Sequence, residues 1–245
     1  MKVLQKNYFC KERYVSNDKA RTLDYSESDT YWTQERIDAS SSRQYQYYVY
    51  SLAVKIARQR RFTSVMDVGS GPGIKAKNFF SGDFKNIILI DQPNTEKKVK
   101  EILPKANFVA ANLENCNIDL DEMVELIVCA DVLEHLFNPI PCIKFVLDHL
   151  TSDGVAIFST PERDILRGPN CLNSPHPSHV REWNTKEFNE LLSYSGFDVV
   201  QQKCMPMEKL TGLDFLLKPF FCRMFRQPKW SSCQTAVCTK SATLT

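Results

Sequence analysis

The chain has 245 residues, and 43% of them are hydrophobic, which is enough for one α/β domain with additions and too many for a disordered chain. Its net charge of only +2, with acids and bases mixed along the sequence, argues against nucleic acid as the main partner. No stretch reaches the length of a membrane span, and the first residues lack the apolar core of a signal peptide.

The first 60 residues are predicted to be an extension ahead of a domain over residues 61–245. Apolar positions at helical spacing predict that the extension ends in a helix over residues 43–58, capped by one of the two preceding serines. This helix either forms a lid over bound ligands or packs its aromatic stripe on the domain. The side chains that a lid would present are Tyr31, Trp32, Arg43, Tyr45, Gln46 and Tyr50.

After residue 61, short apolar runs alternate with helical patterns. Continuous Val/Ile/Leu runs predict buried strands at residues 64–68, 86–91, 108–110, 124–130 and, opened by Gly154, 155–160. Helices are predicted from Ile74, over 96–103 and over 140–150. Because strands of this kind are buried on both faces, the pattern indicates a parallel sheet with helices on each side.

The last part of the chain reads differently. Residues 184–187 form a capping-box pattern that predicts a helix over 185–195, which Gly196 ends. Strands are predicted at 197–204 and 234–240, as antiparallel neighbours at a sheet edge. Between them, the apolar stretch 213–225 is predicted to be a flap or an interface.

A glycine-rich turn follows the first predicted strand. Gly69, Gly71 and Gly73 allow the backbone to approach a ligand closely, and Asp67 precedes them at the strand end. The nicotinamide fingerprint requires glycine at position 74, where this chain has Ile74, which argues against a dehydrogenase.

A second signal lies at the end of the second predicted strand. Asp91 lies 20 residues beyond Gly71, and a carboxylate there can accept hydrogen bonds from both hydroxyls of a ribose. The alternative is an acid in a solvated turn, since residues 91–94 are also turn-like.

The segment after the fourth predicted strand carries a family resemblance. Residues 129–136, Cys-Ala-Asp-Val-Leu-Glu-His-Leu, together with Asn138-Pro139 and the turn 151–154, resemble the class I S-adenosylmethionine-dependent methyltransferases. The resemblance is to the small-molecule type related to the ubiquinone-pathway enzymes, and it covers roughly residues 43–204. It implies a Rossmann-like, doubly wound seven-stranded sheet of order 3-2-1-4-5-7-6 with strand 7 antiparallel, and S-adenosylmethionine as methyl donor.

The resemblance also implies the donor site. The glycine turn and its aspartate would hold the amino-acid end of the donor, Asp91 would hold the ribose, and Ala130 with Asp131 would flank the sulfonium and the substrate entrance. Asn112 would bind an adenine edge, with Leu113 on the ring, although many relatives carry aspartate at this position. The predicted donor-binding residues are Asp67, Gly69, Ser70, Gly71, Gly73, Asp91, Gln92, Asn112, Leu113 and Ala130.

The acceptor is predicted from the long polar loop 160–183. It contains Thr-Pro-Glu-Arg and His-Val-Arg-Glu-Trp segments and resembles sugar and glycan O-methyltransferases. This implies methylation of a hydroxyl on a glycan or nucleotide sugar, with glycosyltransferase modules as partners. Planar and charged groups suit hydroxyl-rich ligands. The predicted substrate contacts are Glu162, Arg163, Arg181, Trp183 and Tyr45.

An alcohol must lose a proton to be methylated, and histidine is the natural base near neutral pH. His179 is the first candidate and His176 the second, while Asp131 could orient the hydroxyl or act as base. Alternatively, His179 only fixes the loop through Glu182 or Asp164. His135 is interpreted as a hydrogen-bonding residue rather than a catalytic one.

Other readings stay open. The acceptor could be a quinol, phenol or natural product, and the fold could serve as a catalytically inactive binding protein. RNA methylation would need a basic stripe on the protein, and the balanced charge of the sequence does not supply one. The nine cysteines have no Cys-x-x-Cys pair and lie partly in apolar runs, so reduced thiols, a cytoplasmic location and no metal site are predicted.

Overall fold

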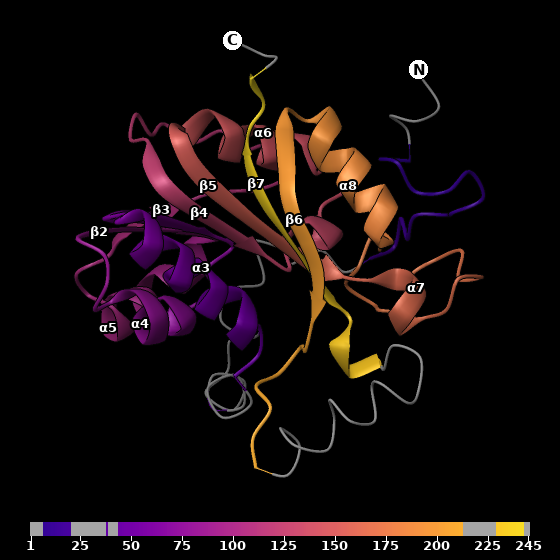
Figure 1. Cartoon of the computed structure of the whole chain (residues 1–245), viewed down its shortest axis with the longest axis horizontal. Helices are drawn as coiled ribbons and strands as arrows, with labels where there is room; N and C mark the ends of the chain where they lie inside the picture. The colour runs from indigo at the N-terminus through magenta and orange to yellow at the C-terminus, as the bar shows by residue number, and fades with distance from the viewer. Residues whose placement is uncertain (1–6, 21–37, 39–43, 213–228, 243–245) are drawn as a thin grey trace.

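The computed structural model describes residues 7–20, 38, 44–212 and 229–242. Its centre is a seven-stranded sheet of order β3-β2-β1-β4-β5-β7-β6 (Figure 1). Strands β1 to β5 are parallel, and β7 runs antiparallel to both β5 and β6, which confirms the predicted fold. The strands are β1 (Ser64–Val68), β2 (Asn86–Asp91), β3 (Asn107–Ala110), β4 (Val124–Ala130), β5 (Leu150–Pro161), β6 (Phe197–Met205) and β7 (Cys233–Lys240).

The strand register aligns the ends from which the predicted site residues come. Val68, the last residue of β1, pairs with Ile90 of β2 and with Cys129 of β4. The next residues along these strands are Gly69, Asp91 and Ala130, so the glycine turn and both predicted ligand positions lie at one edge of the sheet. In open α/β sheets, this carboxyl edge is where ligands bind.

Helices cover both faces of the sheet (Figure 1). One buried cluster joins side chains of α3, α4 and α5 to alternate strand residues such as Val65 and Leu126. The opposite cluster joins α6 and α8 to the intervening residues, such as Met66 and Ile127. The helices are α3 (Tyr47–Arg60), α4 (Ile74–Phe80), α5 (Glu96–Ile102), α6 (Ile140–His149), the single turn α7 (Arg163–Leu166) and α8 (Thr185–Tyr194). Short 3-10 helices are η1 (Pro93–Thr95), η2 (Leu133–His135) and η3 (Lys229–Ser231).

Two predicted boundaries were wrong. Helix α3 begins at Tyr47 rather than at residue 43, because Gln44 and Gln46 have left-handed backbones (φ 50° and 59°) that a helix cannot contain. Strand β5 begins at Leu150 rather than after Gly154, because the chain passes from α6 directly into the strand. The capping box of α8 is confirmed, with Asn184 and Glu187 bonded reciprocally.

Residues 7–20 pack beside α7 and α8 (Figure 1). Backbone amides of Val15 and Asn17 donate to the carbonyl oxygens of Leu172 and Val180, so this segment is fixed to the 160–183 region. The predicted cap of α3, the lid residues Tyr31, Trp32 and Arg43, and the predicted flap 213–225 lie outside the described residues. Within the described part of the chain, the cysteines are free thiols and no helix has the length and apolar character of a membrane span.

We predict that Gly69→Ala destabilises the fold by about 3 kcal/mol or more, since φ is +79° and a Cβ would lie 2.3 Å from Val132 Cγ2. Gly168→Ala is the matched control, because Gly168 has φ +98° and open space around it, so it should lose only about 1–2 kcal/mol. Urea unfolding measures both changes. Equal losses in the two variants would show that the contact with Val132 is not tight.

Candidate active site

The glycine turn is tied to β2 and packs against the segment after β4. The amides of Gly69 and Ser70 both donate to the carbonyl oxygen of Ile90, at 2.8 and 3.2 Å. Gly69, Gly71 and Gly73 have φ of 79°, 56° and 80°, a region that disfavours side chains. At Gly69, the neighbour that excludes a Cβ is Val132, so this glycine lets the turn pack closely against the segment after β4.

Asp91 is oriented by backbone amides. One oxygen accepts from the Gly71 amide at 2.6 Å and the other from the Gln92 amide at 2.7 Å. Burial raises the pKa of Asp91, and these two hydrogen bonds oppose that effect. Each carboxylate oxygen retains a second lone pair, so both can still accept from a ribose hydroxyl.

Asp67 lies beneath helix α3. Its side chain is fully buried, and the Tyr50 hydroxyl lies 2.9 and 3.0 Å from its two oxygens. Burial raises the pKa of Asp67 to about 7, while the Tyr50 hydrogen bond and the Lys75 ammonium lower it. Desolvation lowers the pKa of Lys75, which is surrounded by Asp67, Asp131 and Asp91. Asp67 therefore fixes α3 over the glycine turn. Its negative charge is favoured by Tyr50 and Lys75 and opposed by burial.

Helix α3 also reaches the end of β4. Gln46, just before the helix, donates from Nε2 to the Ala130 carbonyl oxygen at 3.1 Å. Tyr45 pairs with Glu208 in an isolated antiparallel bridge. The residue just before α3 therefore contacts Ala130, the predicted sulfonium position, and a lid role for this region stays a prediction.

Asp131 turns the chain out of β4. It is a non-glycine residue with φ +54°, a conformation that costs about 1 kcal/mol or more and occurs often at functional sites. Ser159, at the end of β5, fixes this turn twice: its carbonyl oxygen accepts from the Asp131 amide at 2.9 Å, and its hydroxyl donates to Asp131 Oδ1 at 2.7 Å.

The predicted adenine residues have structural contacts. Asn112 Oδ1 accepts from the Glu114 amide at 2.8 Å, which forms a turn at the end of β3. Leu113 is buried in the core cluster beneath that turn. Their contact with adenine stays a prediction.

Three histidines meet beside η2. The His179 ring stacks on His176 with centroids 3.9 Å apart, and it meets the His135 ring edge-on at 4.8 Å. His135 Nδ1 donates to the Ser178 carbonyl oxygen at 2.8 Å. Burial, with a contribution from His179, lowers the pKa of His135 to about 4, and burial also lowers the pKa of His176. His135 is therefore neutral at physiological pH.

Glu182 orients His179. Its Oε1 accepts from His179 Nδ1 at 2.7 Å and from Ser174 Oγ at 3.0 Å, and Arg167 pairs with both oxygens. Desolvation raises the pKa of Glu182, but the hydrogen bonds from His179 and Arg167 outweigh it and lower the pKa to about 2. Glu182 is thus an anion at neutral pH, and it leaves His179 Nε2 as the nitrogen that can accept a proton.

Glu134 joins these segments. Its Oε2 accepts from the Thr160 hydroxyl at 3.0 Å, and its carbonyl oxygen accepts from the amides of Val180 and Arg181. Because Glu134 follows β4 and Thr160 ends β5, the histidine cluster lies next to the carboxyl edge of the sheet. Sequence reasoning did not identify Glu134, and no short-range spacing indicates its partners.

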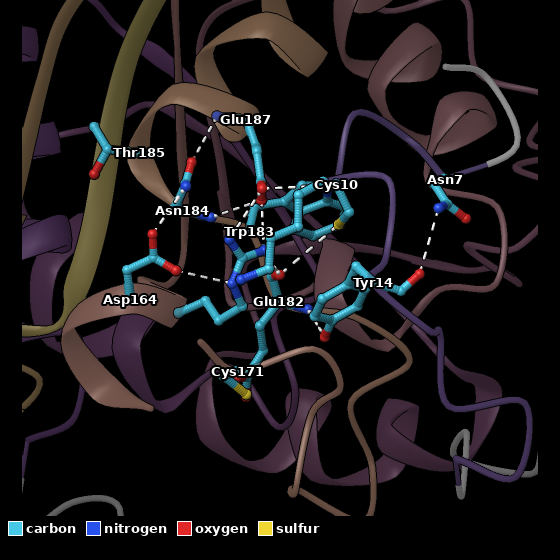
Figure 2. A network of polar contacts seen from close by, with 12 residues as sticks. Asn7, Cys10, Tyr14, Asp164, Cys171, Glu182, Trp183, Asn184, Thr185 and Glu187 are labelled. Atoms are coloured by element: carbon cyan, nitrogen blue, oxygen red, sulfur yellow. Dashed lines mark hydrogen bonds and ion pairs between the residues drawn. The ribbon is translucent and has the colours of Figure 1, made fainter. Parts of the chain in front are cut away.

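Four of the predicted substrate contacts lie inside the protein. The Arg163 guanidinium pairs with Glu187 at 2.6 and 2.9 Å, and Arg181 donates to the Leu136 and Phe137 carbonyl oxygens. Trp183 and Glu162 are buried as well. Figure 2 shows the polar contacts around Trp183, where Cys10 and Tyr14 of the N-terminal segment lie beside Glu182 and Glu187. These side chains hold the loop in place, and a sugar contact for them stays a prediction.

Comparison with known proteins assigns the family. A family model described as a methyltransferase domain matches residues 41–202. The chain belongs to this family. The segment from Tyr45 through β6, with the glycine turn, Asp91 and the histidine cluster, therefore lies almost entirely in the matched methyltransferase domain.

Curated relatives are similar over part of their length. A probable S-adenosylmethionine-dependent methyltransferase of Mycolicibacterium smegmatis is 28% identical over 59% of this chain and 56% of its own. Ubiquinone biosynthesis O-methyltransferases of Rickettsia conorii and Rickettsia akari are 29% and 24% identical, over 73% and 69% of this chain and 63% and 68% of their own. The chain thus spans between about half and two thirds of the length of these relatives.

Solved structures show the same fold. A methyltransferase from Clostridium acetobutylicum superposes with a TM-score of 0.60 at 10% identity, covering 85% of this chain and 95% of that one. The plantazolicin methyltransferase BamL, solved with S-adenosylhomocysteine, gives 0.59 at 16% identity, covering 84% and 87%. The chain thus has the fold of these methyltransferases, and its predicted donor site fits S-adenosylmethionine, since both Asp91 oxygens keep a lone pair for a ribose hydroxyl. When bound, this donor would supply an electrophilic methyl group.

We predict that Asp91→Ala lowers affinity for S-adenosylhomocysteine about tenfold to a hundredfold, because hydrogen bonds to a charged acceptor contribute about 1.5–3 kcal/mol. Titration calorimetry measures the change. Asp153→Ala removes an exposed acid from β5 and should bind like wild type. Equal affinities in the two variants would rule out the ribose role.

We predict that Asp67 makes the protein less stable as pH rises from about 4 to about 7. Its pKa is raised from 3.8 to about 7, so the folded state holds the proton more tightly, and the stabilisation present at low pH is lost through this window. Relative to Asp67→Asn, wild type should lose up to about 1.4 kcal/mol per pH unit there and nothing further above pH 8. Urea unfolding across pH provides the data. A pH-independent difference between the two proteins would contradict the assignment.

Proposed function

We propose that this methyltransferase transfers a methyl group to a hydroxyl of a sugar, on a glycan or a nucleotide sugar. The observation that carries the proposal is the His179–Glu182 pair beside the carboxyl edge of β4 and β5. A positioned neutral imidazole is the group that an alcohol acceptor needs and that a more reactive nucleophile does not.

The reaction is an in-line displacement. The acceptor oxygen must lie about 3 Å from the methyl carbon, opposite the leaving sulfur. Ala130 and Asp131 flank the sulfonium in this proposal, and the Asp131 carboxylate orients the acceptor hydroxyl. His179 Nε2 takes the proton, while Glu182 holds the ring in the required tautomer. His176, stacked on His179, is the second candidate for the base.

The sugar acceptor is supported by the sequence resemblance of loop 160–183 and by the polar surface of that loop. Asn170 and Asn173 are exposed, and His176 and Ser178 are partly exposed. The predicted contacts Glu162, Arg163, Arg181 and Trp183 would act by shaping this loop, since they are buried. Tyr45 would contact the acceptor from the side of α3.

A quinol or phenol is the second candidate acceptor. It is favoured by the similarity to relatives named ubiquinone biosynthesis O-methyltransferases. The same base would serve, because a phenol also loses a proton on methylation.

For either acceptor, we propose one catalytic domain over residues 61–245, with residues 1–60 as its extension. We propose that the protein acts in the cytoplasm and, if the acceptor is a sugar, that its partners are glycosyltransferase modules.

The test is methyl transfer from S-adenosylmethionine to a panel of sugars, nucleotide sugars and catechols, followed by mass spectrometry. We expect a gain of one methyl on a sugar, and a loss of about a hundredfold to ten-thousandfold in kcat for His179→Ala. Glu182→Gln should keep KM and lower kcat, and should change the pH profile. His176→Ala is the histidine control in the same loop.

Methylation of catechols alone would contradict the sugar acceptor. Full turnover by His179→Ala would exclude it as the base, and loss of turnover only in His176→Ala would transfer that role. No methylation of any hydroxyl acceptor, with S-adenosylhomocysteine still bound, would contradict the proposed O-methyltransferase activity.

A further inference from the structure

Three side chains of the histidine cluster come together around one point. Glu134 and His135 of η2 and His179, in the loop between α7 and α8, each offer a ligand atom, and these atoms lie within 4.8 Å of one another. Ligands about 2.1 Å from a tetrahedral zinc ion are about 3.4 Å apart, so a small side-chain adjustment closes the site. Chain segments 44 residues apart supply the two imidazoles.

Glu134 has an unmatched oxygen at this point. Its side chain is fully buried, Oε2 accepts from Thr160, and Oε1 has no hydrogen-bond partner among the residues that the structure describes. Leaving a buried polar atom unpaired costs about 1–3 kcal/mol or more, and native proteins rarely do so without a reason.

Both histidines are oriented as metal ligands are. His135 Nδ1 donates to the Ser178 carbonyl oxygen, and His179 Nδ1 donates to the Glu182 carboxylate. Metal-binding histidines nearly always donate their other ring nitrogen to a carbonyl or carboxylate, which fixes the ring and raises its basicity. In each ring the remaining nitrogen, Nε2, carries the lone pair that binds a cation.

We propose that Glu134, His135 and His179 bind one divalent cation of the zinc class. Two imidazole nitrogens and one carboxylate oxygen suit zinc or cobalt, whereas magnesium prefers an all-oxygen set. Three protein ligands leave a fourth position open. Asp131 is not part of the set, because its carboxylate is not among the ligand atoms that converge in the described part of the chain.

The proposed site differs from the sequence-based expectation of no metal, which stays a prediction. It also bears on the proposed function, on which this consequence rests. A cation on His179 Nε2 would occupy the lone pair that the base requires. An acceptor hydroxyl would then bind the open position, where the cation lowers its pKa, and would release its proton to water. The metal-loaded and metal-free proteins should therefore show different pH profiles of methyl transfer.

The test is a cobalt titration of the full chain after chelator treatment, followed by visible absorbance, with zinc competition by calorimetry. We expect one equivalent bound, with zinc displacing cobalt and magnesium not competing. Glu134→Gln, His135→Gln and His179→Gln should each weaken binding about a hundredfold or more. His176→Gln and Asp131→Asn are the matched controls, and both should bind like wild type.

Several outcomes would overturn the site. A cobalt–thiolate charge-transfer band would place the cation on cysteines, and equal binding by all variants would place it elsewhere. Thermal stabilisation by S-adenosylhomocysteine identifies folded variants and reports on the donor site separately. Cobalt binding without any methyl transfer would support the metal site and contradict the O-methyltransferase proposal. Methyl transfer without cobalt binding would support the O-methyltransferase proposal and contradict the metal site.

Discussion

The site depends on the way Glu134 joins three segments. Its carboxylate accepts a hydrogen bond from Thr160 at the end of β5. Its backbone oxygen accepts hydrogen bonds from the amides of Val180 and Arg181 in loop 160–183. The residue itself follows β4 after the left-handed turn at Asp131. One fully buried glutamate therefore places the histidine cluster beside the carboxyl edge of the sheet, where the methyl donor is predicted to bind.

Charged groups inside the protein make this arrangement specific. Arg163 pairs with Glu187, Arg167 with Glu182, and each pair leaves few polar atoms unsatisfied. Removing one partner of a buried ion pair lowers the stability of the fold by about 3–5 kcal/mol, so the loop has little freedom to adopt another path. Residues 7–20 add to this constraint, since the Tyr14 hydroxyl accepts from the Glu182 amide at 2.9 Å. The extension thus supports the loop that carries the proposed base.

Much of the fold could be predicted from the sequence, because strands and helix starts leave local signals. Examples are the continuous apolar run 124–130 and the capping box at Asn184. The glycine turn was readable for the same reason. The packing of loop 160–183 could not be predicted, because charged residues such as Arg163 and Arg181 are usually exposed. Only the tertiary contacts show that these two are buried. The approach of His135 to His179 likewise depends on a hydrogen bond between distant segments.

In the proposed function, the methyl donor and the acceptor meet at this one edge of the sheet. A crystal structure with S-adenosylhomocysteine bound tests it most directly, through the distance from the donor sulfur to His179 Nε2. One acceptor oxygen between the methyl carbon and the base requires a separation of about 8 Å or less. We expect a separation in that range, with the ribose hydroxyls bound to Asp91. A sulfur more than about 12 Å from the histidine cluster would contradict it.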